Sequence, residues 1–346
     1  MTKPFALALA ALCVVPAASA RAVPATGAEV PARLQWEIKS SDRSDGKVQF
    51  NLSYRTAHSE SMWGHSIDPA ELQGLDRAAL HGSGNAPVRF RIVRDAGSFD
   101  CEGAAWRGSG TGECRFAPGT AFAADLARRG YDSPDDFQLF ELAMADIGRA
   151  YVEEVARQGY ARPTAAELVE AGNHGIHLAY LREMGALGYR VGTLPALVRM
   201  RDHGVDPAYV RSVVSAGLGD LPPDTLVRMR DHGVSAAYVG ELRRLGYGGL
   251  GVDRLIALRD HGVGADYVAA LARSGLNGLS LEELVRLRDH GVSNDYVAGL
   301  RSAGYGFGPD ELVRLRDHGV TGDFARRAAA GGKLSADALI RLRLGG

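Results

Sequence analysis

The chain has 346 residues, of which 23% are charged and 46% are hydrophobic, and its net charge at pH 7 is -1. This balance excludes the low hydrophobicity and high net charge of a disordered chain, and the strongly basic composition that marks a nucleic-acid-binding protein. The length suits two domains of ordinary size. We therefore expect a folded protein with no nucleic-acid partner.

The amino-terminal segment has the three parts of a secretory signal peptide. Lys3 supplies positive charge, an apolar run extends from Phe5 to Val15, and small residues lead to a cleavage point after Ala20. The apolar run is shorter than the ~18 residues that a transmembrane helix needs, so we expect no stable membrane insertion. We predict a signal peptide at residues 1–20, a linker at 21–32, and a mature protein that is periplasmic or secreted.

Residues 33–116 alternate between apolar and polar side chains with a period of two, which is typical of half-buried antiparallel strands. The clearest patterns are LQWEIKS from Leu34, KVQFNLSY from Lys47 and VRFRIVR from Val88. Between the second and third of these, residues 68–80 predict a short helix or turn. We expect a small antiparallel β domain.

Cleavage of the signal peptide would leave two cysteines, Cys101 and Cys114. An even number of cysteines in an oxidising compartment indicates a disulfide. A hairpin with its turn between Trp106 and Ser109 would place the two cysteines directly opposite each other. Because a directly opposed, non-hydrogen-bonded pair has the short separation that a disulfide tolerates, we predict a Cys101–Cys114 disulfide in preference to free thiols or a zinc pair.

From residue 117 onward the sequence repeats with a period of 29 residues, which indicates stacked structural units. We call the residues at one equivalent position of successive repeats a column. One column of glycines follows this period throughout: Gly130, Gly159, Gly188, Gly217, Gly246, Gly275 and Gly304. An aromatic column follows it with a last step of 28: Phe122, Tyr151, Tyr180, Tyr209, Tyr238, Tyr267, Tyr296 and Phe324. A second glycine column, after histidine, does the same: Gly175, Gly204, Gly233, Gly262, Gly291 and Gly319.

Each unit predicts a pair of helices. In one late unit, Ser280 and Glu283 form a capping box, Gly291 supplies the left-handed residue that ends the first helix, and Ser293 caps the second. Helices of about ten residues are marginal alone, so they need neighbouring units to stack against. We predict an α+β protein in which the β domain is followed, at residues 117–346, by an α-solenoid of helix hairpins.

The tetrapeptide RDHG occurs five times and generates columns of charged residues. The arginines that open it, our candidate binding residues, are Arg201, Arg230, Arg259, Arg288 and Arg316. A second arginine column, interrupted by Ala257, contains Arg199, Arg228, Arg286, Arg314 and Arg341. We expect an Asp–Arg ladder that links successive units. The alternative is a groove of guanidinium groups that binds carboxylates or phosphates.

A histidine stands just before each helix-ending glycine: His174, His203, His232, His261, His290 and His318. We expect these rings to bond the last carbonyls of their own helices. One histidine per unit places successive rings roughly 10 Å apart, too far for a shared zinc ion. Since catalysis needs one convergent constellation and not six near-copies, we predict no catalytic residue, no metal and no cofactor.

A second group of possible metal ligands, His58, Glu60 and His65, lies in the segment HSESMWGH. Serines flank these residues, so we interpret the segment as a solvated surface loop.

The motif LxxLRDHGV followed by YV and GY, between Leu284 and Tyr305, resembles the C-terminal repeats behind some bacterial BlaR-type membrane regulators. The stretch Val88 to Phe116 is similar to the small β region that precedes such repeats. The membrane helices and metallopeptidase motif of those regulators are not found in this sequence, so the resemblance does not carry peptidase activity over. It implies a bacterial, extracytoplasmic sensing or interaction module.

We therefore predict an exported, non-enzymatic scaffold that binds a protein or peptide partner in the cell envelope on its helical surface. Two alternatives remain open. One is a metal-dependent hydrolase that uses the His and Asp columns, and the other is a sensor of anionic ligands that uses the Arg column.

Overall fold

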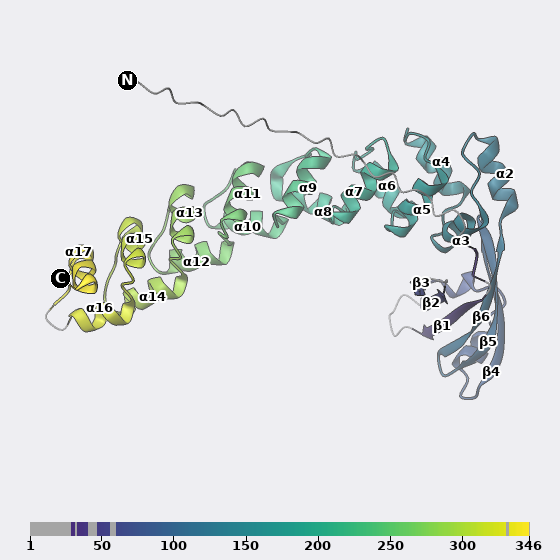
Figure 1. Cartoon of the computed structure of the whole chain (residues 1–346), viewed down its shortest axis with the longest axis horizontal. Coiled ribbons are helices and arrows are strands. Elements are labelled where there is room, and N and C mark those ends of the chain that lie inside the picture. Colours follow the sequence, from purple (N-terminus) through teal and green to yellow (C-terminus); the bar gives the residue numbers. More distant parts are fainter. Residues whose placement is uncertain (1–28, 32, 41–46, 56–59, 330–331, 346) are drawn as a thin grey trace, which may run out of the picture.

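The protein consists of a six-stranded antiparallel sheet followed by a long succession of helices (Figure 1). The computed structural model describes residues 29–31, 33–40, 47–55, 60–329 and 332–345. The predicted α+β class, with the sheet first and the helices after it, is confirmed. The predicted signal peptide and most of the predicted linker lie outside the described residues. Among the described residues, no helix is both long and apolar enough to cross a membrane.

The sheet has the strand order β3-β2-β1-β6-β5-β4. Its strands are β1 (Leu34–Ser40), β2 (Val48–Arg55), β3 (Glu60–Ile67), β4 (Ala86–Arg94), β5 (Gly97–Trp106) and β6 (Ser109–Pro118). A 3₁₀ turn (Pro69–Glu71) and the short helix α1 (Arg77–His81) connect β3 to β4, as expected for residues 68–80. The sheet ends two residues beyond the predicted domain boundary at residue 116.

Strand β3 corrects one prediction. The sequence predicts a solvated loop for His65, but the residue lies in β3 opposite Phe50 of β2, and its ring stacks on Trp63 with centroids 4.4 Å apart. The segment does not alternate strongly between apolar and polar residues. Its strand conformation therefore depends on pairing with β2. Glu60 begins this strand, and His58 lies outside the described residues.

The sheet is strongly curved around its apolar face. The rings of Phe50 in β2 and Phe90 in β4 lie 6.2 Å apart, although three strands separate β2 from β4. In a flat sheet those two strands would be about 19 Å apart, given the usual spacing between neighbouring strands. The curvature encloses a small core in which Trp36, Phe50 and Phe90 are all buried.

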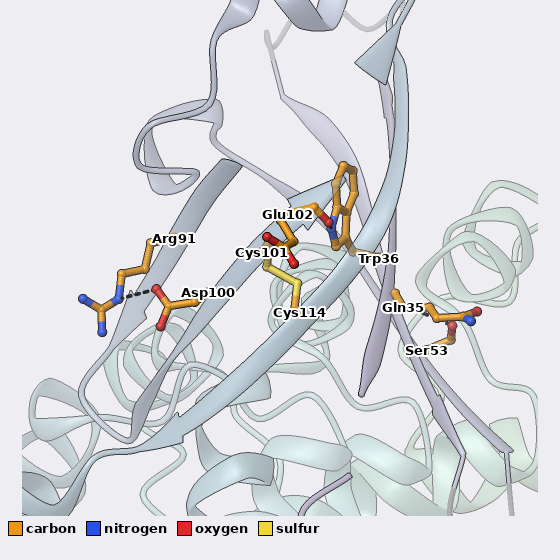
Figure 2. The surroundings of a disulfide bond; sticks show 8 residues. All are labelled: Gln35, Trp36, Ser53, Arg91, Asp100, Cys101, Glu102 and Cys114. Atoms are coloured by element: carbon orange, nitrogen blue, oxygen red, sulfur yellow. Dashed lines mark hydrogen bonds and ion pairs between the residues drawn. A yellow bond between two sulfur atoms is a disulfide. The ribbon is translucent and has the colours of Figure 1, made fainter. Parts of the chain in front are cut away.

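Two opposed glycines make room for the Trp36 indole in this core. Gly103 and Gly112 face each other across β5 and β6. A Cβ atom on either of them would lie 2.7 Å from an atom of the indole. The indole Nε1 donates to the Glu102 carbonyl at 3.2 Å. Figure 2 shows the tryptophan beside Glu102, close to the disulfide.

The predicted disulfide is present between Cys101 and Cys114, which are directly opposed with Cα atoms 4.0 Å apart (Figure 2). The hairpin turn falls at the predicted place. Arg107 and Gly108 both have positive φ angles, 46° and 80°, as a two-residue turn between twisted strands requires.

The helices that follow the sheet are nine residues long in most cases. They are α2 (Thr120–Arg128), α3 (Asp136–Met144), α4 (Arg149–Arg157), α5 (Ala165–Asn173), α6 (Leu178–Ala186), α7 (Leu194–Asp202), α8 (Pro207–Val213), α9 (Pro223–Asp231), α10 (Ala236–Arg244), α11 (Val252–Asp260), α12 (Ala265–Arg273), α13 (Leu281–Asp289), α14 (Asn294–Ser302), α15 (Pro309–Asp317), α16 (Gly322–Ala328) and α17 (Ala336–Leu344). A π-helical segment, Val214–Leu218, extends α8.

The helices lie in two rows that lead away from the sheet (Figure 1). Even-numbered helices contact their even-numbered neighbours without interruption from α4 to α16. Odd-numbered helices do the same from α3 to α11 and from α13 to α17. Each hairpin therefore buries its apolar side chains against the hairpins before and after it.

The predicted helix boundaries hold in detail. Ser280 and Glu283 form a capping box at the start of α13, and Ser293 caps α14. Gly291 has φ 68°, and the next residue, Val292, donates its N–H to the Leu287 carbonyl. This is the Schellman arrangement, which needs a residue that tolerates the left-handed conformation.

The sheet packs against the first helices through α3. Phe140 of α3 is fully buried, and its ring lies 5.2 Å from that of Tyr54 and 5.4 Å from that of Phe116. Asp95, in the turn between β4 and β5, accepts a hydrogen bond from the Arg149 N–H at the start of α4. The two parts are thus joined by both apolar and polar contacts.

We predict that Gly112→Ala lowers the free energy of unfolding of the β domain by about 1–3 kcal/mol, because the methyl group would overlap the Trp36 indole and the Glu102 carbonyl. Urea denaturation followed by tryptophan fluorescence measures this. Gly240 of α10 is the matched control, because a Cβ there meets no atom within 4 Å. Gly240→Ala should raise stability by up to about 1 kcal/mol. Equal effects of the two substitutions would contradict the packing around Trp36.

Candidate functional site

Polar side chains gather along the helical array, where the RDHG columns lie, and in a cavity between the sheet and the first helices. The columns contain the residues that the sequence singled out. We call the second place the junction cavity; it is lined chiefly by Trp63, His65, Arg94, Asp146, Tyr151 and His177.

Five of the six column histidines bond to the next unit and not to their own helix, which corrects the prediction. The Nδ1–Oδ1 distances are 2.6 Å for His174–Asp202, 2.6 Å for His203–Asp231, 2.5 Å for His232–Asp260, 2.8 Å for His261–Asp289 and 2.9 Å for His290–Asp317. A carboxylate is a stronger acceptor than a backbone carbonyl, so it takes the ring nitrogen wherever it is within reach.

His318 is the exception that fits the original prediction. Its Nδ1 lies 2.7 Å from the Arg314 carbonyl of its own helix. At the position of the next RDHG aspartate the chain has Leu344, which offers no carboxylate.

The five candidate binding arginines lie between units, each over the tyrosine ring of the preceding unit. The distances from Cζ to ring centroid are 5.4 Å for Arg201–Tyr180, 4.7 Å for Arg230–Tyr209, 5.1 Å for Arg259–Tyr238, 5.1 Å for Arg288–Tyr267 and 5.2 Å for Arg316–Tyr296. Arg230 also donates from Nε to the carbonyl of Gly204 at 2.8 Å. These guanidinium groups make cation–π contacts near the carboxyl ends of the preceding helices, where the helix dipole favours positive charge.

The tyrosine hydroxyls form a further set of links, which the sequence analysis missed. Each donates to a valine carbonyl of the next unit at 2.8 Å: Tyr180 to Val205, Tyr209 to Val234, Tyr238 to Val263, Tyr267 to Val292 and Tyr296 to Val320. Burial raises the pKa of Tyr238 to about 12, so its hydroxyl remains a donor at neutral pH. The available signal was the choice of tyrosine over phenylalanine at six consecutive positions of the aromatic column, of which the first, Tyr151, forms no such link.

A ladder of Asp–Arg pairs does link successive units through the second arginine column, but its aspartates are not those of RDHG, which we expected to form it. Arg199 pairs with Asp224 at 2.6 Å and Arg228 with Asp253 at 2.9 Å. The same contact joins Arg286 to Asp310 and Arg314 to Asp337. These aspartates lie in the first turn of the next odd-numbered helix. The five RDHG aspartates are bonded to histidines and take no part in this ladder. The pairs are exposed, so each contributes at most about 1 kcal/mol.

The unit nearest the sheet lacks the arginine that covers a tyrosine ring in the later units. Gly172 occupies the place of the RDHG arginine, so no guanidinium covers the Tyr151 ring from there. Tyr151 is 1% exposed, and its hydroxyl has no hydrogen-bond partner. Burial raises the pKa of this hydroxyl, so it stays protonated.

The junction cavity has a volume of about 380 Å³ and lies beside this irregular unit. Strand β3 contributes Trp63 and His65, β4 contributes Arg94, and the first turns of α4 and α6 contribute backbone and side chains. The rings of His65 and His177 meet edge to face with centroids 5.4 Å apart.

The acidic groups of the junction cavity form ion pairs with arginines. Arg94, with 16% of its side chain exposed, lies 2.6 Å from a Glu71 oxygen and 3.1 Å from an Asp146 oxygen. Asp146 adopts φ 54°, an uncommon conformation for a residue other than glycine. Burial lowers the pKa of His65, and the neighbouring His177 and Arg94 lower it further, so its imidazole is neutral at pH 7.

Comparison with protein-family models, with characterised proteins and with solved structures found no match to this chain. Within the part of the chain that the structure describes, no group of three or more His, Cys, Asp or Glu side chains is arranged to hold a metal ion.

We predict that Tyr238→Phe lowers the free energy of unfolding by about 1–2 kcal/mol, because it leaves the buried Val263 carbonyl without its donor. Urea denaturation followed by circular dichroism at the helical band measures this. Tyr151→Phe is the matched control: it removes a buried hydroxyl that has no partner, so stability should stay the same or rise. Similar losses in both variants would show that the hydroxyl links do not hold the units together.

Proposed function

We propose that residues 117–346 form an α-solenoid and that the protein is an exported, non-enzymatic scaffold, which binds a protein or peptide partner in the cell envelope. One observation carries this proposal. The recurrent polar side chains are candidate catalytic or binding groups in the sequence, but in the structure they contact one another between successive helix pairs.

Each regular junction between units uses the same contacts. A tyrosine hydroxyl bonds a valine carbonyl, an arginine covers that tyrosine, and a histidine bonds an aspartate, as for Tyr209, Val234, Arg230, His203 and Asp231. In such an array each unit contacts only its neighbours, so the length and regularity of the array generate an extended surface. An extended, rigid surface suits a macromolecular partner better than a small substrate.

The same contacts argue against the anionic-ligand alternative. The RDHG arginines lie over tyrosines, and an RDHG aspartate follows each of them in sequence. The second arginine column is paired with aspartates at Asp224, Asp253, Asp310 and Asp337. Positive and negative charges therefore alternate along the array, which leaves little net field for a phosphate or carboxylate polymer.

The proposal is tested by capture of a partner from envelope extract with the mature protein, compared with a variant in which Arg230, Arg259 and Arg288 are all changed to Ala. We expect the variant to lose three cation–π contacts, so its melting temperature should fall by roughly 5 °C or more. The folded variant should still retrieve the same partner, and the complex should survive raised salt.

Other outcomes would favour the alternatives. Loss of the partner by a folded variant, together with a steep salt dependence, would favour the anionic-ligand sensor. A stoichiometric metal ion in the purified protein would favour the hydrolase and contradict the scaffold. We expect metal analysis to return none.

A further inference from the structure

The two edge strands of the sheet differ in how their outer sides are protected. Strand β4 is the protected edge. Gln73 and Arg91 exchange two backbone hydrogen bonds on its outer side, at 2.9 and 2.8 Å. Pro87 lies in this strand and lacks a donor, and both the 3₁₀ turn and α1 pack against it. Proteins use such devices to prevent a further strand from adding to a sheet.

Strand β3 forms the opposite edge and has none of these protections among the described residues. It pairs with β2 on one side, and within that part of the chain no helix makes an extensive contact with it. Its sequence, ESMWGHSI, contains no proline, lysine or arginine. Met62 is 77% exposed, more than any other large apolar side chain that the structure describes, and Gly64 is also exposed. An open edge with an exposed apolar side chain is a template for pairing with another chain.

The register of the sheet determines which backbone groups β3 leaves unpaired. In an antiparallel sheet one residue directs its N–H and C=O to one side, and the next residue directs them to the other. Arg91 of β4 bonds outward to Gln73. The unbroken registers carry this alternation across β5, β6, β1 and β2 to β3. Met62, Gly64 and Ser66 therefore direct their backbone groups away from β2.

An extended polypeptide is the ligand that these backbone groups fit. They repeat at every second residue of a strand, and another strand carries donors and acceptors at the same spacing. Strand addition of this kind obtains affinity from main-chain hydrogen bonds and specificity from the sites that receive alternate side chains. A compact small molecule cannot match the repeat, so the open edge indicates a protein or peptide ligand.

The junction cavity lies on the inner side of the same strand and would receive side chains of an added strand. Trp63 and His65 line it and alternate with the outward-bonding residues. The lining contains three carboxylates and one guanidinium group: those of Glu71, Asp95, Asp146 and Arg94. Arg149 pairs with Asp95 from outside the lining, and the sum remains negative. A basic side chain of the added strand is therefore favoured there over an acidic one.

A second copy of this chain fits the edge less well. Two β3 strands paired across a two-fold axis would place two negatively charged cavities on the same face of the joined sheet. Asp68, which is exposed and directly follows β3, would add to the repulsion. A basic strand from another protein neutralises the same charges.

We propose that the free edge of β3 binds an extended, basic segment of a partner protein. The segment adds as a seventh strand, with its backbone bonded to Met62, Gly64 and Ser66 and a basic side chain directed to the junction cavity. This inference rests on the proposed scaffold function, because it locates a contact that the partner makes.

Amide hydrogen exchange of the mature protein, measured by NMR, tests the state of the edge. We expect the amides of Met62, Gly64 and Ser66 to exchange at least about tenfold faster than those of the residues between them, which bond to β2. Addition of a basic strand-forming peptide should slow the fast set. Equal protection of both sets in the free protein would show that the edge is already covered, and would overturn the proposal.

Calorimetric titration with matched peptides tests the ligand. The probe is a capped peptide in which valine and threonine alternate between terminal lysines. One control has glutamates in place of the lysines, and another is the lysine peptide with N-methyl groups on every second residue, which removes the donors of one edge. We expect the unmodified lysine peptide to bind at least about tenfold more tightly than either control.

A variant of β3 separates edge pairing from folding. Met62→Pro removes an outward N–H and leaves the bonds to β2 in place, so the melting temperature should stay the same while affinity for the lysine peptide falls about tenfold or more. Met62→Thr is the matched control, because it shortens the exposed side chain and keeps the N–H. It should bind like the unaltered protein.

The proposal is overturned if the lysine peptide shows no saturable binding up to about 1 mM, if the three peptides bind equally, or if a folded Met62→Pro variant binds with unchanged affinity. A dimer of the unaltered protein that Met62→Pro dissociates would assign the edge to a second copy and also overturn it.

Failure of this inference is distinguishable from failure of the scaffold function. If the unaltered protein and Met62→Pro capture the same partner equally from envelope extract, the edge proposal fails and the scaffold proposal stands. If neither captures a partner, the scaffold proposal fails, and the peptide titrations still decide whether the edge binds a strand.

Discussion

The helical part of this protein depends on one constraint: a nine-residue helix is too short to be stable without a neighbour to pack against. Each hairpin therefore has to be completed by the next. The tyrosine hydroxyls fix how this happens, since each reaches the carbonyl of the valine that follows a helix-ending glycine in the next unit, as Tyr267 reaches Val292. One buried hydrogen bond thus joins the end of one helix to the ring of the preceding unit and sets the register of the stack.

The RDHG motif follows from the same geometry. In a regular unit the arginine covers the preceding tyrosine, the aspartate accepts from the preceding histidine, and the histidine bonds the following aspartate, as Arg259, Asp260 and His261 do. The glycine after the histidine adopts the left-handed conformation that ends the helix. Because the charged pairs are exposed, they contribute modestly, and their regular placement serves alignment of the units more than stability.

At the sheet the regular pattern stops, because the first unit meets β strands and not another hairpin. Gly172 replaces the covering arginine, the side chain of Gln158 reaches the Leu181 carbonyl between α4 and α6, and His177 stands where later units have a capping oxygen. Of the two polar atoms without a partner on the residues around the junction cavity, the Tyr151 hydroxyl belongs to this irregular unit and His65 Nδ1 belongs to β3.

The sequence by itself determined what depends on short spacings. The period of 29, the caps at Ser280 and Ser293, and the Cys101–Cys114 pairing all follow from residues that are close together in the chain, because local backbone geometry decides them. The tertiary structure decided what depends on distant neighbours. The strand at β3 needed β2, and the column histidines found aspartates in the next unit. His65 met His177 only because the curved sheet packs against the first helices, through α3. A side chain takes the best partner within reach, and which partners are within reach is fixed only when the elements pack.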